Sequence, residues 1–87
     1  MKWENVREQY PDRWVVFEAL AAHTEEDTRF VGELAVIDHF MEGRDAMKRQ
    51  HELHKAHPTR EYYFFHTSRE NLNIVERKWA GIRGFRA

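Results

Sequence analysis

The 87-residue sequence contains no cysteine, and this absence removes two classes of small protein. Without thiols there is neither a disulfide framework nor a thiolate zinc site. With only two prolines and four glycines, the chain also has no low-complexity tract or linker. No apolar run approaches the roughly 20 residues that span a bilayer, and the amino terminus lacks a signal-peptide pattern. We therefore expect a cytoplasmic protein with no membrane partner.

Net charge is almost absent as well, because 14 basic residues stand against 15 acidic ones. The resulting charge of −1 gives no global field that would attract nucleic acid. Hydrophobic residues at 41% and charged residues at 33% are typical of a folded globular chain. Aromatic residues reach 14%, which suits a compact core and a binding surface equally well. At this length we expect one domain, residues 1–87, with a thin core.

Hydrophobic patterning predicts a short helical turn within residues 1–11, where Trp3 and Val6 keep helical spacing until Pro11. The rest of the pattern predicts two strands joined by a polar turn, a one-sided helix before Pro58, and a third strand; these elements cover residues 14–23, 29–40, 44–57 and 61–66. Gly32 marks a bulge or a close approach within the second strand. A helical turn is predicted over 67–73, and a partly extended tail over 74–87.

The order of these elements predicts the fold class. A right-handed crossover from the second strand to the third places the third strand beside the first. The expected architecture is α+β, with a three-stranded sheet in the order 2-1-3 and the main helix on one face. The inner stripe of that helix should contain Ala46, Met47, Gln50, Leu53, His54 and His57.

Both sides of the predicted sheet are apolar, whereas a single helix covers only one side. Either Trp3, Val6 and Trp79 fold back over the other side, or a second chain covers it. We favour a homodimer through the sheet, together with binding of another protein. The residues expected at this interface are aromatic residues of the uncovered face and part of the tail: Trp14, Tyr62, Phe64, Trp79, Ile82 and Arg83.

The segment FHTSRE has two interpretations. Thr67 followed by Glu70 fits a capping box, in which a hydroxyl and a glutamate satisfy the first N–H groups of a helix. Alternatively, Ser68 is a nucleophile and His66 its base, but no orienting acid is specified and there is no G-x-S-x-G elbow. We favour the capping box.

The histidines are the candidate metal ligands. His51, His54 and His57 are spaced by three on the predicted helix, and His39 and His66 lie at strand ends. If the fold brings them together, their imidazoles can bind zinc or nickel. Histidines at such positions more often hydrogen-bond to the backbone, so we expect no cofactor and no catalytic residue. A small metal-binding protein or enzyme built on His54, His57, His39 and His66 is the first alternative.

Two further patterns concern charge. Glu18 lies within the most apolar strand, where it must find a partner or face solvent. We favour an ion pair with Arg13, Arg29 or Arg60 over a functional acid. The second alternative function is an antitoxin-like regulator that binds nucleic acid weakly. Its contacts would be the basic residues of the helix and of the tail: Arg44, Lys48, Arg49, Lys55, Arg77, Lys78, Arg83 and Arg86.

The segments YPDRWVVFEALAAHT, LAVIDHF, ELHKAHP, EYYFFHTSRE and ERKWAGIRG resemble a family of small uncharacterised bacterial proteins, from Tyr10 to Gly84. That family has no known activity, so the resemblance implies no catalytic residue. Its genes neighbour those of retropepsin-like aspartic proteases, which implies a partner or regulator of such a protein. The chain is also similar to HicB-type antitoxins, in size and element type only. We therefore expect a non-enzymatic protein-interaction module.

Overall fold

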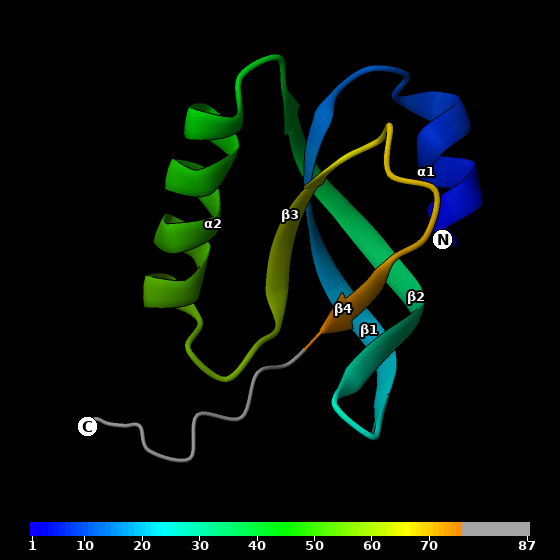
Figure 1. Cartoon of the computed structure of the whole chain (residues 1–87). Coiled ribbons are helices and arrows are strands. Elements are labelled where there is room, and N and C mark those ends of the chain that lie inside the picture. The colour runs from blue at the N-terminus through cyan, green and yellow to red at the C-terminus, as the bar shows by residue number, and fades with distance from the viewer. Residues whose placement is uncertain (76–87) are drawn as a thin grey trace.

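A four-stranded antiparallel sheet forms the centre of the molecule in the computed structural model, which describes residues 1–75 (Figure 1). The strands lie in the order β3-β1-β2-β4, and two helices accompany them. In chain order the elements are α1 (Trp3–Gln9), β1 (Trp14–Glu25), β2 (Thr28–Phe40), α2 (Gly43–Ala56), β3 (Tyr62–His66) and β4 (Asn73–Val75). The predicted α+β class is confirmed.

The first strand is central, as predicted. It pairs with β2 along its whole length and with β3 from Trp14 to Glu18. The bulge predicted at Gly32 is confirmed, because Ala21 pairs with Glu33 and Ala22 with Val31, which leaves Gly32 without an opposite residue. The predicted order 2-1-3 is therefore correct for three of the four strands.

The fourth strand was not predicted, and the helical turn predicted over residues 67–73 is wrong. After β3 the chain makes a turn and then runs to β4, which pairs with residues 28–30 of β2. Leu72 is buried in the core, 6% exposed. Because this side chain has to reach the sheet, the segment crosses the sheet face and does not coil on itself.

The main helix α2 covers one face of the sheet, as predicted. Ala46 is buried, Gln50 donates a hydrogen bond from Nε2 to the Tyr62 carbonyl (3.1 Å), and the Trp14 ring lies against Gly43. The inner stripe is narrower than predicted, because His54 is exposed and Met47 is 42% exposed.

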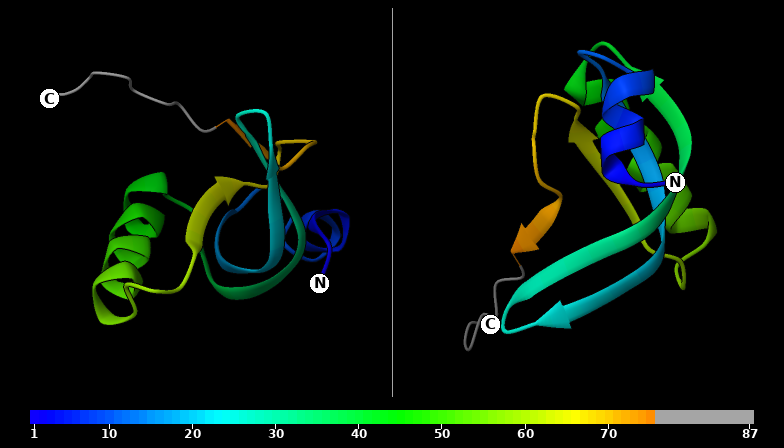
Figure 2. Two further views of the ribbon diagram at one scale, coloured as in Figure 1. Left: turned by 90° about the horizontal axis from the view of Figure 1, so that it is seen from below. Right: turned by 90° about the vertical axis from the view of Figure 1, so that its right-hand side faces the viewer.

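The opposite face is covered by α1 and by the segment between β3 and β4 (Figure 2, left). The Trp3 ring lies 5.9 Å from the Phe17 ring, and Trp3 Nε1 donates to the Arg69 carbonyl (2.8 Å). The core on this side consists of Trp3, Val6, Val15, Phe17, Leu34 and Leu72. The expectation of an uncovered sheet face is therefore wrong, since the described part of the chain covers both faces itself.

Neither α1 nor α2 is long and apolar enough to cross a membrane.

Candidate functional site

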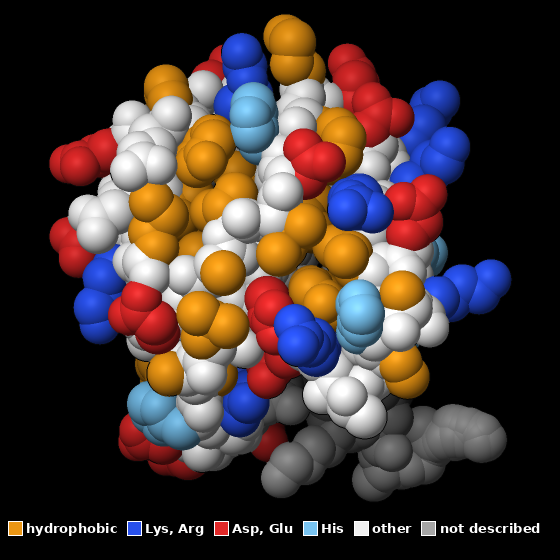
Figure 3. Space-filling view, turned by 180° about the vertical axis from the view of Figure 1, so that it is seen from behind, with side chains coloured by type: hydrophobic (Ala, Val, Ile, Leu, Met, Phe, Trp, Pro, Cys, Tyr) orange, Lys and Arg blue, Asp and Glu red, His pale blue; other side chains and the backbone are white. Residues whose placement is uncertain are grey.

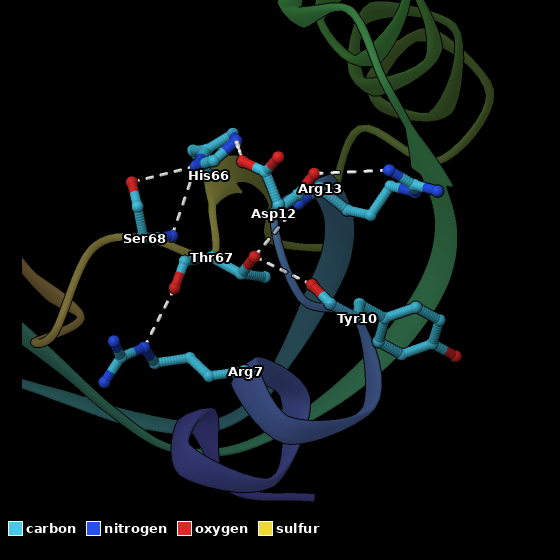
Figure 4. Close-up of polar contacts among 7 residues, drawn as sticks. All are labelled: Arg7, Tyr10, Asp12, Arg13, His66, Thr67 and Ser68. Carbon is cyan, nitrogen blue, oxygen red and sulfur yellow. Dashed lines mark hydrogen bonds and ion pairs between the residues drawn. The ribbon is translucent and has the colours of Figure 1, made fainter.

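Thr67 is the best-connected polar residue of the segment FHTSRE, and it is 3% exposed (Figure 4). Its hydroxyl donates to the Tyr10 carbonyl (2.7 Å) and accepts from the Arg13 N–H (3.1 Å). Its backbone N–H donates to the Arg13 carbonyl (2.9 Å), and its carbonyl accepts from Arg7 Nε (2.8 Å). The predicted capping box is thus wrong, because this hydroxyl joins the α1–β1 connection to the end of β3.

The Ser68 and His66 pair is in hydrogen-bond contact, and an acid lies near it. His66 Nδ1 is 2.8 Å from Ser68 Oγ, and His66 Nε2 is 3.4 Å from Asp12 Oδ1 (Figure 4). Asp12 reaches this position because the turn after α1 gives it a left-handed backbone, φ 55°. Sequence reasoning missed Asp12, because 54 residues separate it from His66.

This Ser-His-Asp arrangement lacks the surroundings that nucleophilic catalysis needs. The Asp12 side chain is 92% exposed, so water competes for the carboxylate. The Ser68 N–H donates to His66 Nδ1 (3.1 Å). This hydrogen bond uses the backbone N–H that lies nearest for stabilising an oxyanion, and it occupies the same histidine nitrogen that faces Ser68 Oγ. The contacts therefore fix the turn after β3.

Three of the four candidate metal ligands lie against different aromatic rings, and the fourth, His54, is exposed. His39 contacts Tyr10 (centroids 4.9 Å apart), and His66 contacts Trp14 (5.2 Å). His57 lies 6.4 Å from Tyr62, and His54 is exposed on α2. Within residues 1–75, no group of three or more His, Asp or Glu side chains is arranged to hold a metal ion.

The interface residues predicted on the sheet lie on the side that α2 covers. Tyr62 is 6% exposed, which leaves little of its side chain for a partner, and its place at an interface stays a prediction. Trp14 and Phe64 are half-buried, with ring centroids 6.0 Å apart. The other predicted interface residues, Trp79, Ile82 and Arg83, lie outside the described residues.

Two ion pairs connect strands β1 and β2 to the segment that precedes β3. Glu18 pairs with Arg60 (Oε1 to Nη1, 3.4 Å), one of the three cations predicted for it. Arg29 binds Glu61 through two hydrogen bonds of 2.9 Å, and the Tyr63 hydroxyl donates to the same carboxylate. Burial, followed by the hydrogen bond to Glu61, raises the pKa of Tyr63 to about 12.

The Arg29 hydrogen bond holds the pKa of Glu61 below its ordinary value of 4.5. A carboxyl whose pKa is depressed by folding stabilises the fold above its unfolded pKa, and that contribution is lost as pH falls through the folded value. We expect Glu61→Gln to reduce the free energy of unfolding by about 1 kcal/mol at pH 7. The difference from the wild type should shrink below pH 4.5.

Urea unfolding of both proteins between pH 7 and pH 3 checks this expectation. Glu52→Gln is the control. Glu52 also pairs with an arginine, Arg49 at 3.4 Å, but it is exposed and its partner lies on the same helix. A difference between wild type and Glu61→Gln that stays constant across this pH range would contradict the role given to the carboxylate.

The outer edge of β2 is only partly paired. Residues 28–30 pair with β4, and Leu34 exchanges two backbone hydrogen bonds with Met1 (2.9 and 3.0 Å). Beyond Leu34, no strand among residues 1–75 pairs with this edge. Within the described residues, the half of β2 over residues 35–40, here called the open edge, therefore has no strand beside it.

Apolar side chains border the open edge. Ile37 is 39% exposed, and Val36 and Phe40 are half-buried. The view from behind shows hydrophobic side chains gathered across the middle of the molecule, with charged side chains beside them (Figure 3). A shallow groove of about 310 Å³ runs between the open edge and α2, lined by Asp38, Phe40, Asp45, Lys48, Arg49 and Glu52.

A second, larger cleft of about 770 Å³ lies between α1, the first half of β2 and the segment before β4. Trp3 and Leu72 contribute apolar surface to it, and Lys2, Arg7 and Glu8 line it with charges of both signs. This mixture of charges selects no ligand class.

No protein-family model matches the chain, and neither a curated protein nor a solved structure matches it. The resemblance to a bacterial family and the aspartic-protease-like partner that it implies therefore stay predictions.

Proposed function

We propose that this protein is a non-enzymatic interaction module that binds extended protein segments at the open edge of β2. The observation that carries the proposal is the absence of a partner strand beyond Leu34 within residues 1–75. A row of unpaired N–H and C=O groups is a template for an added strand, and the side chains next to it supply specificity.

The surroundings of the open edge support this proposal over a binding site on the sheet face. Both faces are covered by α1, α2 and the segment before β4, whereas the open edge is bordered by exposed apolar surface. Apolar surface at a sheet edge is buried when a strand is added.

The enzyme and metal alternatives have less support. The Ser-His-Asp contact is solvent-exposed at Asp12. Three of the candidate metal ligands, His39, His57 and His66, lie against separate aromatic rings. One basic residue of α2, Arg49, also has acidic neighbours, since it lies 3.9 Å from Asp38 and 3.4 Å from Glu52. That mixture does not favour binding to phosphates.

Site-specific photo-crosslinking in cells of the organism that naturally produces the protein tests the proposal. A benzophenone amino acid replaces Met41, which directly follows β2 and is 74% exposed. The matched control replaces Met47, which is 42% exposed on α2. We expect protein adducts of defined mass from Met41 and none of the same mass from Met47, because only Met41 is next to the open edge.

Equal labelling from the two positions, or no adduct from Met41, would contradict binding at the open edge. The adduct mass also identifies the class of partner. An adduct of twice the chain mass indicates a second copy, and any other mass indicates a different protein.

A further inference from the structure

The open edge has features that select one particular partner. We propose that two copies of this chain pair antiparallel through their open edges, so that β2 and the partner's β2 join two four-stranded sheets into one. This inference rests on the proposed function, because it names the occupant of the same edge.

The outward-facing backbone groups of the open edge come from two residues. Leu34 bonds to Met1, so its N–H and C=O point away from β1, and the alternation of a strand makes Val36 point the same way. Val16 pairs with Asp38 and Phe17 with Val36, which makes Ile37 an extra, bulged residue. The bulge shifts the alternation by one, so His39 is the next residue that faces outward.

This spacing suits pairing between identical edges. In an antiparallel pair about a two-fold axis, Val36 of one copy lies opposite His39 of the other, and His39 opposite Val36. Each such pair exchanges two backbone hydrogen bonds. Ile37 and Asp38 of both copies then lie next to the axis, where the exposed Ile37 side chains become buried against each other.

Asp38 controls access to this pairing. Its Oδ1 accepts the His39 N–H (2.9 Å), so the carboxylate occupies a donor that the second copy requires. Its Oδ2 lies 3.9 Å from Arg49 Nε. Arg49 can hold the carboxylate when His39 donates to the second copy, so each acid at the axis keeps a cation. The net charge of −1 adds little repulsion between copies.

Two variants that place opposite charges at position 37, measured separately and as a mixture, test the dimer. Sedimentation equilibrium over a wide concentration range should show dimerisation of the wild type. Ile37→Glu and Ile37→Lys should each raise the dimer Kd by about tenfold or more, because like charges then meet at the axis. An equimolar mixture of the two variants should restore dimers, as opposite charges now meet. Circular dichroism verifies that both variants stay folded.

Met47→Glu is the matched control, since Met47 and Ile37 are similarly exposed, 42% and 39%. Arg49 faces the open edge, and Met47 lies about 200° around α2 from it. Substitution of Met47 should therefore leave the dimer Kd unchanged. A wild type that is monomeric throughout, or a mixture that stays monomeric, overturns the dimer. Adducts from Met41 at a mass other than twice the chain would in that case still support the proposed function.

Discussion

Phe17→Ala is expected to reduce the free energy of unfolding by about 3–5 kcal/mol, the usual cost of truncating a fully buried aromatic residue. Phe17 is 0% exposed in the first half of β1. Its ring lies 5.9 Å from those of Trp3 and Tyr63 and 6.2 Å from that of Phe65, so it joins α1 to β3 across the sheet. A domain of this size has roughly 5–10 kcal/mol in total, so the variant should lose half of its stability or more.

Thermal unfolding by circular dichroism measures this loss. Each kcal/mol corresponds to about 4–8 °C at this chain length, so Tm should fall by roughly 15 °C or more. Leu20→Ala is the control, because Leu20 lies on the same strand but is 57% exposed. All proteins are compared at one concentration, since self-association would raise Tm. Equal losses in the two variants would mean that the core is not centred on Phe17.

Thr67→Val is expected to cost about 2–4 kcal/mol, although valine has nearly the same shape. The substitution leaves the Tyr10 carbonyl without its donor and the Arg13 N–H without its acceptor, next to a side chain that is 3% exposed. A buried backbone group without a partner costs more than a hydrogen bond contributes when it forms. This variant therefore separates the hydroxyl from the packing of the residue.

Urea unfolding of Thr67→Val and Thr67→Ser together checks the expectation. Serine keeps the hydroxyl and loses one methyl group, so its loss should be about 1 kcal/mol. A Thr67→Val variant as stable as the wild type would contradict this expectation. In that case the two hydrogen bonds would contribute nothing and α1 would be held by apolar contacts alone.

The local signals in the sequence predicted most of the elements correctly. Pro11 and Pro58 each follow a helix within two residues, because proline cannot continue a helical hydrogen-bond pattern. Gly32 forms the predicted bulge, and Glu18 has Arg60, one of its three candidate cations. Each of these features depends on neighbouring residues or on the chemistry of one side chain.

The prediction failed where two local patterns competed. Thr67 and Glu70 fit a capping box, but Leu72 is buried when the same segment stays extended. Burial of a leucine is worth about 1.5–3 kcal/mol, compared with about 1 kcal/mol for a cap. The position of Asp12 beside His66 could not be predicted, because the turn after α1 brings these two residues together in the folded chain.

Composition and periodicity by themselves determined the α+β class of this chain and the place of β1 at the centre of its sheet. These properties follow from which residues are apolar and how they alternate along the chain. Only the tertiary structure decided that α1 and Leu72 cover the second face, that Thr67 joins two distant turns, and that no strand among residues 1–75 pairs with β2 beyond Leu34. Those properties depend on contacts between residues far apart in the chain, whose geometry is set by packing and not by local pattern.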